Sequence, residues 1–424
     1  MEKPVTKLMN RNFVLLWAGQ AVSALGSRAF TFSMMLWLME VSDSGTLMGL
    51  IMVASSLPAI LLGPIGGTFA DRFSRRRILI VTDTINGIAV ISAAAVIFFH
   101  REAPALAIAW LFVVAALGGI LGAFFRPATN AAIPDLVPQD KLAAGNALNQ
   151  FSKQAADMLG QLVGPIAFRL LGAPWLFLLN GLSFLASAGS ETFIEIPQKI
   201  APREEGRHRF RAFLDSTKEG MIYVWKDRGL RALFSGVAAM NFFMAPFIIL
   251  VPFYVDHVLK VRVDWFGFLM AAMAIGSIAG LAVAGTVKIT PGRRRRMLLA
   301  ALFLSALTLC GLAAVGSAPL ALVLFFVFGC AVAFFNVHVL TILQASVESE
   351  IRGRVLGLLE TLSRSLAPIG MAVFGVVIDL LDKNVPRLFL LIGGLLLVIS
   401  AVLALHREFR RFLEQAPEVQ PAAG

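Results

Sequence analysis

Residues 66–79 read "GGTFADRFSRRRIL" and place one carboxylate and four arginines between two long apolar runs. In a soluble protein such a cluster would indicate a basic surface patch for nucleic acid. Its surroundings argue otherwise, because 58% of the 424 residues are hydrophobic, 15% are charged and the mean hydropathy is +0.79. Soluble domains hold about 45–50% apolar residues. The sequence therefore predicts an integral membrane protein that lies in a lipid bilayer.

Apolar runs long enough to cross a hydrocarbon core of about 30 Å recur along the whole chain. Within lipid the backbone must satisfy its own hydrogen bonds, and the runs are too long for barrel strands, so all of them are expected to be helices. We predict an all-α protein with twelve transmembrane helices, at residues 12–39, 46–68, 78–99, 104–126, 145–170, 174–194, 230–256, 264–287, 297–316, 319–341, 354–379 and 387–406.

The formal net charge of +11 is unevenly distributed over the predicted loops. With the N-terminus inside, the outer loops hold only Arg101, Arg169, Lys260, Arg262, Lys383 and Arg387. This asymmetry follows the positive-inside rule and places both termini in the cytoplasm. The "GRRRR" run at 292–296 is then a topological signal, and no aromatic interleaving supports a nucleic-acid partner.

Two similar halves are expected on either side of the longest polar segment. We predict a six-helix half over 1–194, a cytoplasmic loop over 195–229, a second six-helix half over 230–406 and a cytoplasmic tail over 407–424. At a constant offset of 210 residues, "GILGAFFR" (119–126) matches "GCAVAFFN" (329–336), and the offset continues to Leu171 and Leu381. The repeat favours a duplicated unit with parallel halves, a plan described for secondary transporters.

The opening stretch resembles the loop 2/3 signature of the major facilitator superfamily, G-x-L-a-D-r-x-G-r-k-x-x-l. Its positions are filled by Gly67, Asp71, Arg72, Arg75 and Arg76, whereas Phe69 replaces Leu and Ser74 replaces Gly. The resemblance implies a twelve-helix alternating-access transporter in which these residues form a gating latch. An aspartate here can meet a helix N-terminus of the other half, where the helix dipole favours an anion. The alternative is a purely topological role.

A second, partial resemblance lies in the fifth predicted helix. "GQLVGP" (160–165) looks like the first half of the antiporter signature g-x-x-x-G-P-x-x-G-G, but Phe168 and Arg169 take the final glycine positions. Gly160 and Gly164 share one helix face, where small residues let another helix approach closely, and Pro165 would add a bend. The motif favours antiport, and simple helix packing remains the alternative.

Longer stretches narrow the resemblance. "NFVLLWAGQAVSALGSRAFTFSMMLWL" (12–38), "FFRPATNAAIPDLVPQDKLAAGNAL" (124–148) and "VESEIRGRVLGLLETL" (347–362) look like the macrolide-efflux and enterobactin-exporter branch of the superfamily. The resemblance implies export of amphipathic small molecules while protons move inward. It also implies a monomer in the inner membrane of a bacterium.

Ionisable groups within lipid are expensive, so each is a functional hypothesis. Arg28 lies past the middle of the first span, and we expect it to attract anionic substrate groups or balance a coupling carboxylate. An ion pair with another helix, or snorkelling, is the alternative. Asn149, Lys153 and Asp157 recur every four residues on the face of Gly160. Lys153 and Asp157 can pair, and Asp157 is then a candidate proton carrier, against a static pair.

Several weaker candidates remain. Asp83 could extend a cytoplasmic charge network with Arg126, or act in a proton relay. Glu191 and Glu195 are expected simply to lie at the membrane interface. The other candidates are Glu360 and Arg364, read as an ion pair near the gate, and His338, a polar ligand contact or a satisfied structural residue.

Other kinds of function have no support in the sequence. It has no Walker A, G-x-S-x-G, H-E-x-x-H or C-x-x-C motif, so we expect neither an enzyme nor ATP drive, and no cofactor or metal. Both cysteines, Cys310 and Cys330, fall in predicted spans and imply no disulfide framework. The 34 phenylalanines favour a bulky, partly hydrophobic substrate. We therefore predict a proton-driven exporter. A lysophospholipid carrier without obligatory protons is the alternative within transport, and a non-transporting membrane sensor is the more distant one.

Overall fold

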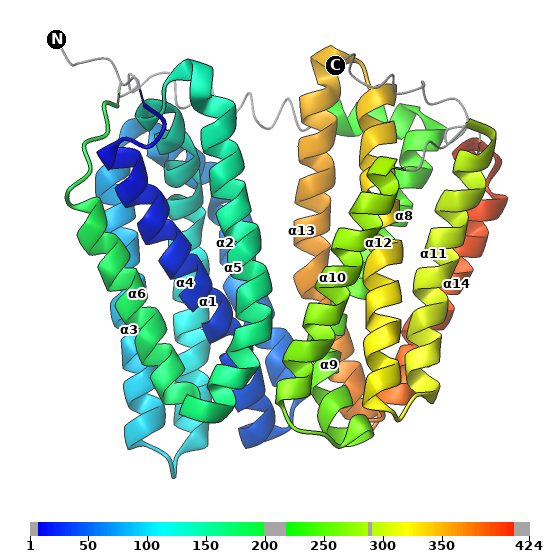
Figure 1. The fold of residues 1–424 in the computed structure, drawn as a ribbon, viewed down its shortest axis with the longest axis horizontal. Coiled ribbons are helices and arrows are strands. Elements are labelled where there is room, and N and C mark those ends of the chain that lie inside the picture. Colours follow the sequence, from blue (N-terminus) through cyan, green and yellow to red (C-terminus); the bar gives the residue numbers. More distant parts are fainter. Residues whose placement is uncertain (1–6, 199–217, 287–290, 411–424) are drawn as a thin grey trace. The chain divides into compact units, whose positions relative to one another are not determined.

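The computed structural model describes residues 7–198, 218–286 and 291–410, and these residues form helices and no strand. The chain divides into two compact units, Met1–Phe213 and Leu214–Gly424, which are described separately below. Figure 1 shows that long helices make up each unit.

The N-terminal unit contains six long helices. They are α1 (Arg11–Ser42), α2 (Gly45–Arg72), α3 (Arg75–Phe99), α4 (Pro104–Leu136), α5 (Leu142–Leu171) and α6 (Ala173–Glu191), with the short 3₁₀ helix η1 (Gln139–Lys141) before α5. α2 packs on α4, α3 on α6, and α1 on both α5 and α6. Loop residues cap the helices, as where the Asn10 side chain accepts a hydrogen bond from the N–H of Phe13 at 3.0 Å.

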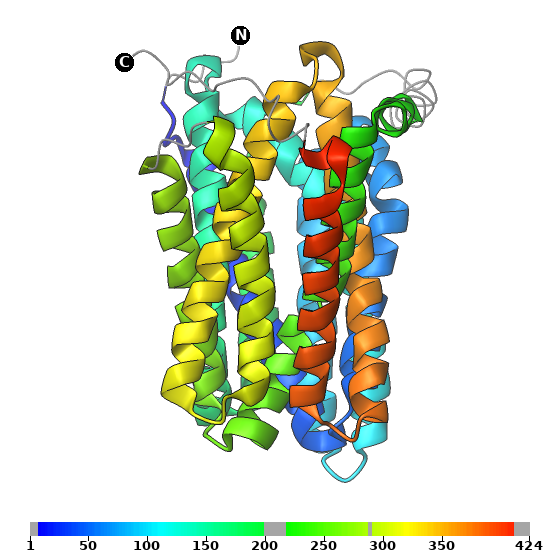
Figure 2. The same cartoon turned by 90° about the vertical axis from the view of Figure 1, so that its right-hand side faces the viewer.

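The C-terminal unit follows a related plan. After a helical stretch over 218–226, its helices are α8 (Arg228–Met244), α9 (Phe247–Phe253), the π-helix η2 (Tyr254–Leu259), α10 (Asp264–Thr286), α11 (Pro291–Ala314), α12 (Ala318–Ser346), α13 (Ser349–Leu380) and α14 (Val385–Leu405). α10 packs on α12, α11 on α12 and α14, and α8 on α13. Figure 2 views this unit from the side, with α14 in red.

The expected spans coincide with helices, but their number is only partly supported. The span predicted at 230–256 covers most of α8, all of α9 and the first half of η2. Ten helices in the described part of the chain, with α8, α9 and η2 taken together, are long and apolar enough to cross a membrane, and α5 and α6 are not among them. Twelve spans and cytoplasmic termini therefore stay predictions.

The fourth helix is longer than predicted. We expected its span to end at residue 126, with a loop beyond, whereas α4 continues to Leu136 through Pro127 and Pro134. The apolar periodicity continues after the uniformly apolar run has ended: Ala128, Ala132 and Leu136 recur every four residues and are buried. They pack in one cluster with Phe13 of α1, which stabilises the extension.

The internal repeat is visible in the helix ends. α4 ends at the cap residue Val137 and α12 at the cap residue Val347, both in extended conformation and exactly one repeat offset apart. The next long helices, α5 after the short η1 and α13 after α12, end at Leu171 and Leu380. The same sequence distance therefore produces the same pair of helices in each unit.

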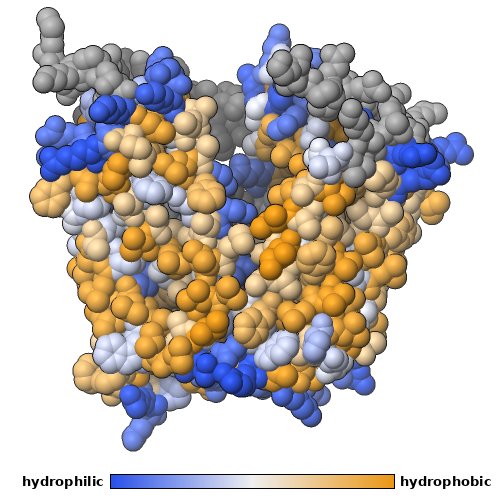
Figure 3. Space-filling view, in the orientation of Figure 1, coloured by the Kyte–Doolittle hydropathy of each residue, from blue (hydrophilic) through white to orange (hydrophobic). Residues whose placement is uncertain are grey.

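The surface agrees with a membrane environment. On the face shown in Figure 3, a broad hydrophobic band covers the middle of each unit, and hydrophilic residues gather at the helix ends. Large apolar side chains such as Leu61, Leu179 and Val398 are exposed, each on a different helix. Such an extensive exposed apolar surface marks contact with lipid.

Candidate functional site

The loop 2/3 motif forms the junction between α2 and α3. α2 ends at Arg72, and α3 begins at Arg75 after two linking residues. Ser74, which departs from the superfamily signature, is the N-cap of α3: its hydroxyl accepts a hydrogen bond from the N–H of Arg77 at 3.4 Å. A Cβ added at Gly67 would meet no atom within 4 Å, so no close packing at this glycine is seen in the described structure.

Arg75 is the centre of the polar contacts at this junction. Its guanidinium forms an ion pair with Asp135 near the end of α4 and donates to the carbonyl of Ala131 at 2.9 Å. Asp71 lies 3.8 Å away on the preceding turn. The Arg75 side chain is only 13% exposed, so these contacts are shielded from solvent. The arginine expected to fix Asp71 therefore also ties α3 to α4.

The segment after α6 holds the motif from the other side. The Gln198 side chain accepts from the N–H of Arg75 at 2.8 Å and donates to the carbonyls of Ala70 at 3.2 Å and Phe73 at 3.0 Å. Arg76 donates to the carbonyls of Glu191, at 3.3 Å, and Thr192. Sequence analysis missed Asp135 and Gln198, because neither belongs to the motif and both are far from it along the chain.

A second polar site lies where α1 crosses α5. Arg28 of α1 and Asp157 of α5 form an ion pair, with side chains 51% and 33% exposed. The ion pair with another helix, given above as the alternative for Arg28, is thus formed with Asp157, which was instead expected to pair with Lys153. Lys153 is exposed and Asn149 half-buried on the same helix.

The two glycines of the antiporter-like motif make this crossing possible. A Cβ at Gly160 would overlap Cβ of Arg28. A Cβ at Gly164 would lie 3.5 Å from the Cα of Ala29 and from Cβ of Phe32. α5 continues past the buried Pro165 without interruption. The motif therefore packs α5 directly against the part of α1 that carries Arg28.

The corresponding crossing in the C-terminal unit has a different chemistry. Gly370, one repeat offset from Gly160, lies against α8, where an added Cβ would overlap the carbonyl of Phe242. The Phe242 ring lies 5.1 Å from Phe243 and 5.9 Å from Phe374. An aromatic cluster thus stands in the C-terminal unit where the N-terminal unit has an ion pair.

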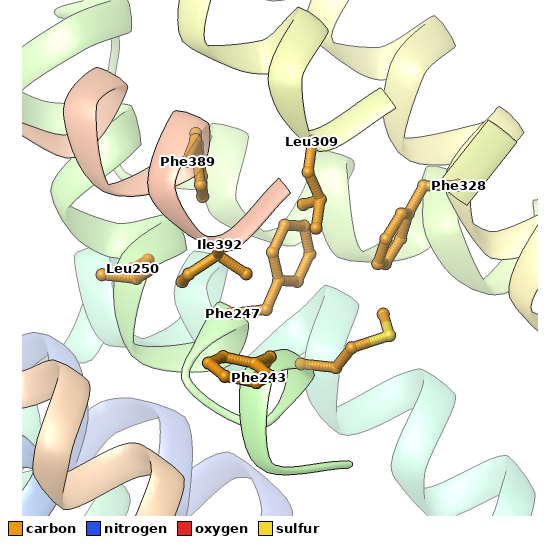
Figure 4. Close-up of a pocket in the computed structure, with 8 residues that line it drawn as sticks. Phe243, Phe247, Leu250, Leu309, Phe328, Phe389 and Ile392 are labelled. Atoms are coloured by element: carbon orange, nitrogen blue, oxygen red, sulfur yellow. The ribbon is translucent and has the colours of Figure 1, made fainter. Parts of the chain in front are cut away.

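An apolar pocket continues from this cluster. Figure 4 shows Phe243, Phe247 and Phe328 around it, with their rings directed into the same space. Its complete lining is Phe243, Met244, Phe247, Leu250, Leu309, Phe328, Phe389 and Ile392, with no charged side chain.

The predicted charge network of Asp83 and Arg126 is not formed. Asp83 is buried, and neither of its carboxylate oxygens has a hydrogen-bond partner, whereas Arg126 is exposed on α4. Glu191, expected at the membrane interface, is fully buried within the protein and accepts a hydrogen bond from Gln20 at 3.2 Å; its position relative to the membrane stays a prediction. Its helix ends there, but the following segment folds back and buries Ile194. Glu195 is exposed.

The remaining candidates lie in the C-terminal unit. His338 bonds through Nδ1 to the carbonyl of Phe334, one turn earlier on α12, at 2.8 Å, so part of its hydrogen-bonding capacity is used locally. Glu360 is exposed on α13. The side chain of Arg364 lies outside the described residues, so the expected pair with Glu360 stays a prediction.

Known efflux proteins are similar to this chain in sequence. Macrolide efflux protein A of Streptococcus pyogenes is 25% identical over 411 residues, which cover 94% of this chain and 96% of the relative. Multidrug efflux pump Tap of Mycolicibacterium fortuitum is 26% identical over 406 residues, 92% of this chain and 95% of the relative. The similarity extends over almost the whole length of both relatives.

Solved transporter structures have the same fold. The nucleoside transporter NupG matches with a TM-score of 0.71 and 14% identity, over 93% of this chain and 98% of that one. A D-xylose-proton symporter matches with a TM-score of 0.67 and 15% identity, over 92% and 96%. The model of the Major Facilitator Superfamily matches residues 16–369 and 261–420. The resemblance seen in the loop 2/3 motif is therefore confirmed, and the chain belongs to the Major Facilitator Superfamily.

Proposed function

We propose that this protein exports amphipathic organic molecules of the drug, macrolide or siderophore type by proton antiport, through alternating access of its two halves. The observation that carries the proposal is the ion pair of Arg28 and Asp157 at the crossing built by the antiporter-like motif. The efflux proteins among the relatives support the direction of transport and the class of substrate.

The two residues of the ion pair, Arg28 and Asp157, are placed so that each could exchange the other for a different partner. Both side chains are partly exposed, so a ligand or a proton can reach them without unfolding the helices. A proton on Asp157 would release Arg28 to an anionic or polar group of the substrate, and loss of that proton would restore the pair. Lys153 and Asn149, on the same helix, would add polar contacts.

The aromatic residues of the C-terminal unit supply a complementary surface. Phe242, Phe243 and Phe374 stand at the crossing that corresponds to Arg28, and flat apolar rings accept varied hydrophobic groups. These rings would accept the apolar part of a substrate.

Asp71 and the arginines of loop 2/3 are proposed to form the latch that opens and closes the cytoplasmic side. Arg75 already holds this junction to α4, which would keep Asp71 in a fixed position for a partner. The lipid-carrier alternative would use Arg28 to bind a phosphate. The pairing of Arg28 with Asp157 disfavours it, because the arginine is not a standing cationic site.

The test uses everted bacterial membrane vesicles with an acidified interior and a pH-sensitive dye. A macrolide, a catechol siderophore and a lysophospholipid are added in turn. We expect one of the first two to release protons from the vesicles, and Asp157→Asn to abolish that release. Asp379→Asn is the matched control, because Asp379 also pairs with a cation, Lys383, which lies four residues further on, just past the end of α13; it should behave like wild type.

The outcomes separate the alternatives. Movement of labelled lysophospholipid without proton release would replace the proposal with the lipid carrier. Binding of substrate without any movement would indicate a sensor. Proton release that survives in Asp157→Asn would keep antiport but remove Asp157 as the proton carrier.

A further inference from the structure

Two carboxyl groups lie together inside the N-terminal unit and take no part in the site described above. Asp83 on α3 and Glu191 at the end of α6 have exposed fractions of 1% and 0%. α3 packs along α6, and the two groups are close enough for the charge of one to act on the other. In Figure 1 these two helices lie side by side.

The polar atoms around the pair lack partners. Gln20 of α1 donates to one oxygen of Glu191 at 3.2 Å. The second Glu191 oxygen and both oxygens of Asp83 have no hydrogen-bond partner. The hydroxyl of Ser187, which is 1% exposed, lies within hydrogen-bonding reach of both carboxyl groups but forms no well-aligned bond, and its single proton can be donated to only one of them at a time. Buried polar atoms in native proteins are nearly always bonded, so such a cluster calls for a missing bonding partner.

No cation neutralises the two carboxyl groups among the described residues. The ionisable groups of the helices packed around them are Arg11, Arg28, Glu40, Asp71, Arg72, Arg75, Arg77, Arg126, Asp135, Lys153, Asp157 and Arg169. None of these bonds to either carboxyl group. The guanidinium of Arg76 binds backbone carbonyls, including that of Glu191, and not the carboxyl groups.

A shared proton accounts for both observations. Two ionised carboxylates that are buried together without a cation repel each other and lose their hydration, so both cannot remain charged. A protonated carboxyl group is also a hydrogen-bond donor, which an ionised one is not. One proton would therefore remove a charge and supply a bond between the unpartnered oxygens.

We infer that Asp83 and Glu191 form a proton-binding site, in which one dissociable proton is held between the two carboxyl groups beside Ser187. Its use as a coupling site rests on the antiport proposed above. Arg76 connects the site to the loop 2/3 motif, because it holds the backbone carbonyl of Glu191 itself. A rearrangement of the loop would therefore displace one member of the pair and change its hold on the proton.

Infrared difference spectroscopy of the purified, lipid-reconstituted protein tests the site without any transport. We expect a carbonyl band of a protonated carboxyl group that shifts in D₂O and disappears at alkaline pH. The double variant Asp83→Asn/Glu191→Gln should lack this band. Each single variant should lose it at a less alkaline pH than wild type, because the neighbouring negative charge is gone. Ser187→Ala, which keeps both carboxyl groups, should shift the frequency of the band.

The matched control is Asp264→Asn. Asp264 is also buried, at 7% exposed, but its carboxylate bonds to Arg262 at 2.7 Å. Its removal should leave the band unchanged. All variants are compared at equal recovery of monodisperse protein, and Ser187→Ala keeps the test informative if the carboxyl variants do not fold.

Three results would overturn the inference: no such band in wild type, a band that persists in the double variant, or a band that does not respond to pH. A band that disappears when sodium chloride replaces potassium chloride would also overturn it, in favour of a sodium site. Failure of the vesicle assay with a normal infrared result would reject antiport while leaving the proton site standing.

Discussion

Arg28 and Asp157 form an ion pair between α1 and α5, at the level where Gly160 brings the two helices together. α1 has no acidic residue within one turn of Arg28, so Arg28 meets a carboxylate only because α5 crosses α1 here. Its geometry depends on the absence of a side chain at Gly160. Changes at that glycine and changes to the charges should therefore have related effects.

Gly160→Leu is expected to separate α1 from α5 and abolish transport. Its Cβ alone would overlap Cβ of Arg28, and overpacking of this kind costs about 1–3 kcal/mol of stability. The measurement is the midpoint of thermal unfolding in detergent, followed by substrate efflux from whole cells.

Gly353→Leu is the control for this change, because a Cβ at Gly353 on α13 would meet no atom within 4 Å. It should unfold and transport like wild type. Equal behaviour of the two leucine variants would show that the close approach at Gly160 is not needed.

Single neutralisation of the α1–α5 pair should be worse for folding than removal of both charges. Arg28→Leu leaves Asp157 without its cation, and Asp157→Leu leaves Arg28 without its anion, whereas the double variant leaves no unpaired charge. Monodisperse yield in detergent should follow that order, and none of the three should transport. Independent, additive losses would contradict the coupling of the two residues.

Arg75→Ala is expected to destabilise the N-terminal unit by about 3–5 kcal/mol, the range for breaking a largely buried ion pair by removing one partner. The change strands Asp135 and removes the donor to the Ala131 carbonyl. Thermal unfolding measures the loss. Arg77→Ala, at an exposed position two residues along, is the control and should remain within about 0.5 kcal/mol of wild type.

Asp71→Asn should instead affect transport more than stability. Asp71 is 3.8 Å from Arg75 and one-third exposed, so its own contribution to folding is small, within about 1 kcal/mol. If it acts as the latch, efflux should fall while the unfolding midpoint hardly changes. A parallel loss of both would identify Asp71 as a structural residue only.

A separate prediction concerns Ser74, which stands where the superfamily signature has glycine. Ser74→Ala removes the N-cap of α3 and should cost about 0.5–2 kcal/mol, whereas Ser74→Gly, the residue of the superfamily signature, should cost only a few tenths. Thermal unfolding of the two variants side by side decides this. The hydrogen bond to Arg77 would be unimportant if alanine and glycine had the same effect.

The sequence was sufficient for the class of fold and for the motif, because both are local patterns. Apolar runs located the helices, and residues 67–76 identified the superfamily. The sequence was not sufficient to predict which residues contact the loop 2/3 motif. Asp135 meets Arg75 because α4 extends past its apolar run, and Gln198 reaches the motif from beyond α6. Such contacts depend on packing between segments that are far apart in the chain.

Glu191 illustrates the same limit from another direction. Its place near the end of an apolar run suggested the membrane interface, but burial depends on what covers a residue as well as on its depth along a helix. Arg76 and the segment after α6 cover it. Periodicity correctly grouped Asp157 with Gly160 on one face, yet it contained no information on which helix that face would meet.

Val137 and Val347 end corresponding helices and lie one repeat offset of 210 residues apart, and this distance limits where residues can be inserted into the chain. Because an α-helix turns by about 100° for each residue, one residue inserted between Val137 and Asp157 would rotate the carboxylate away from Arg28. Arg28 and Phe242 do not follow the offset of 210, so residues have been gained or lost before α4 without loss of the fold. Insertions should therefore be tolerated in the earlier loops of each half, whereas the short connection from α4 to α5 sets the register on which the polar crossing depends.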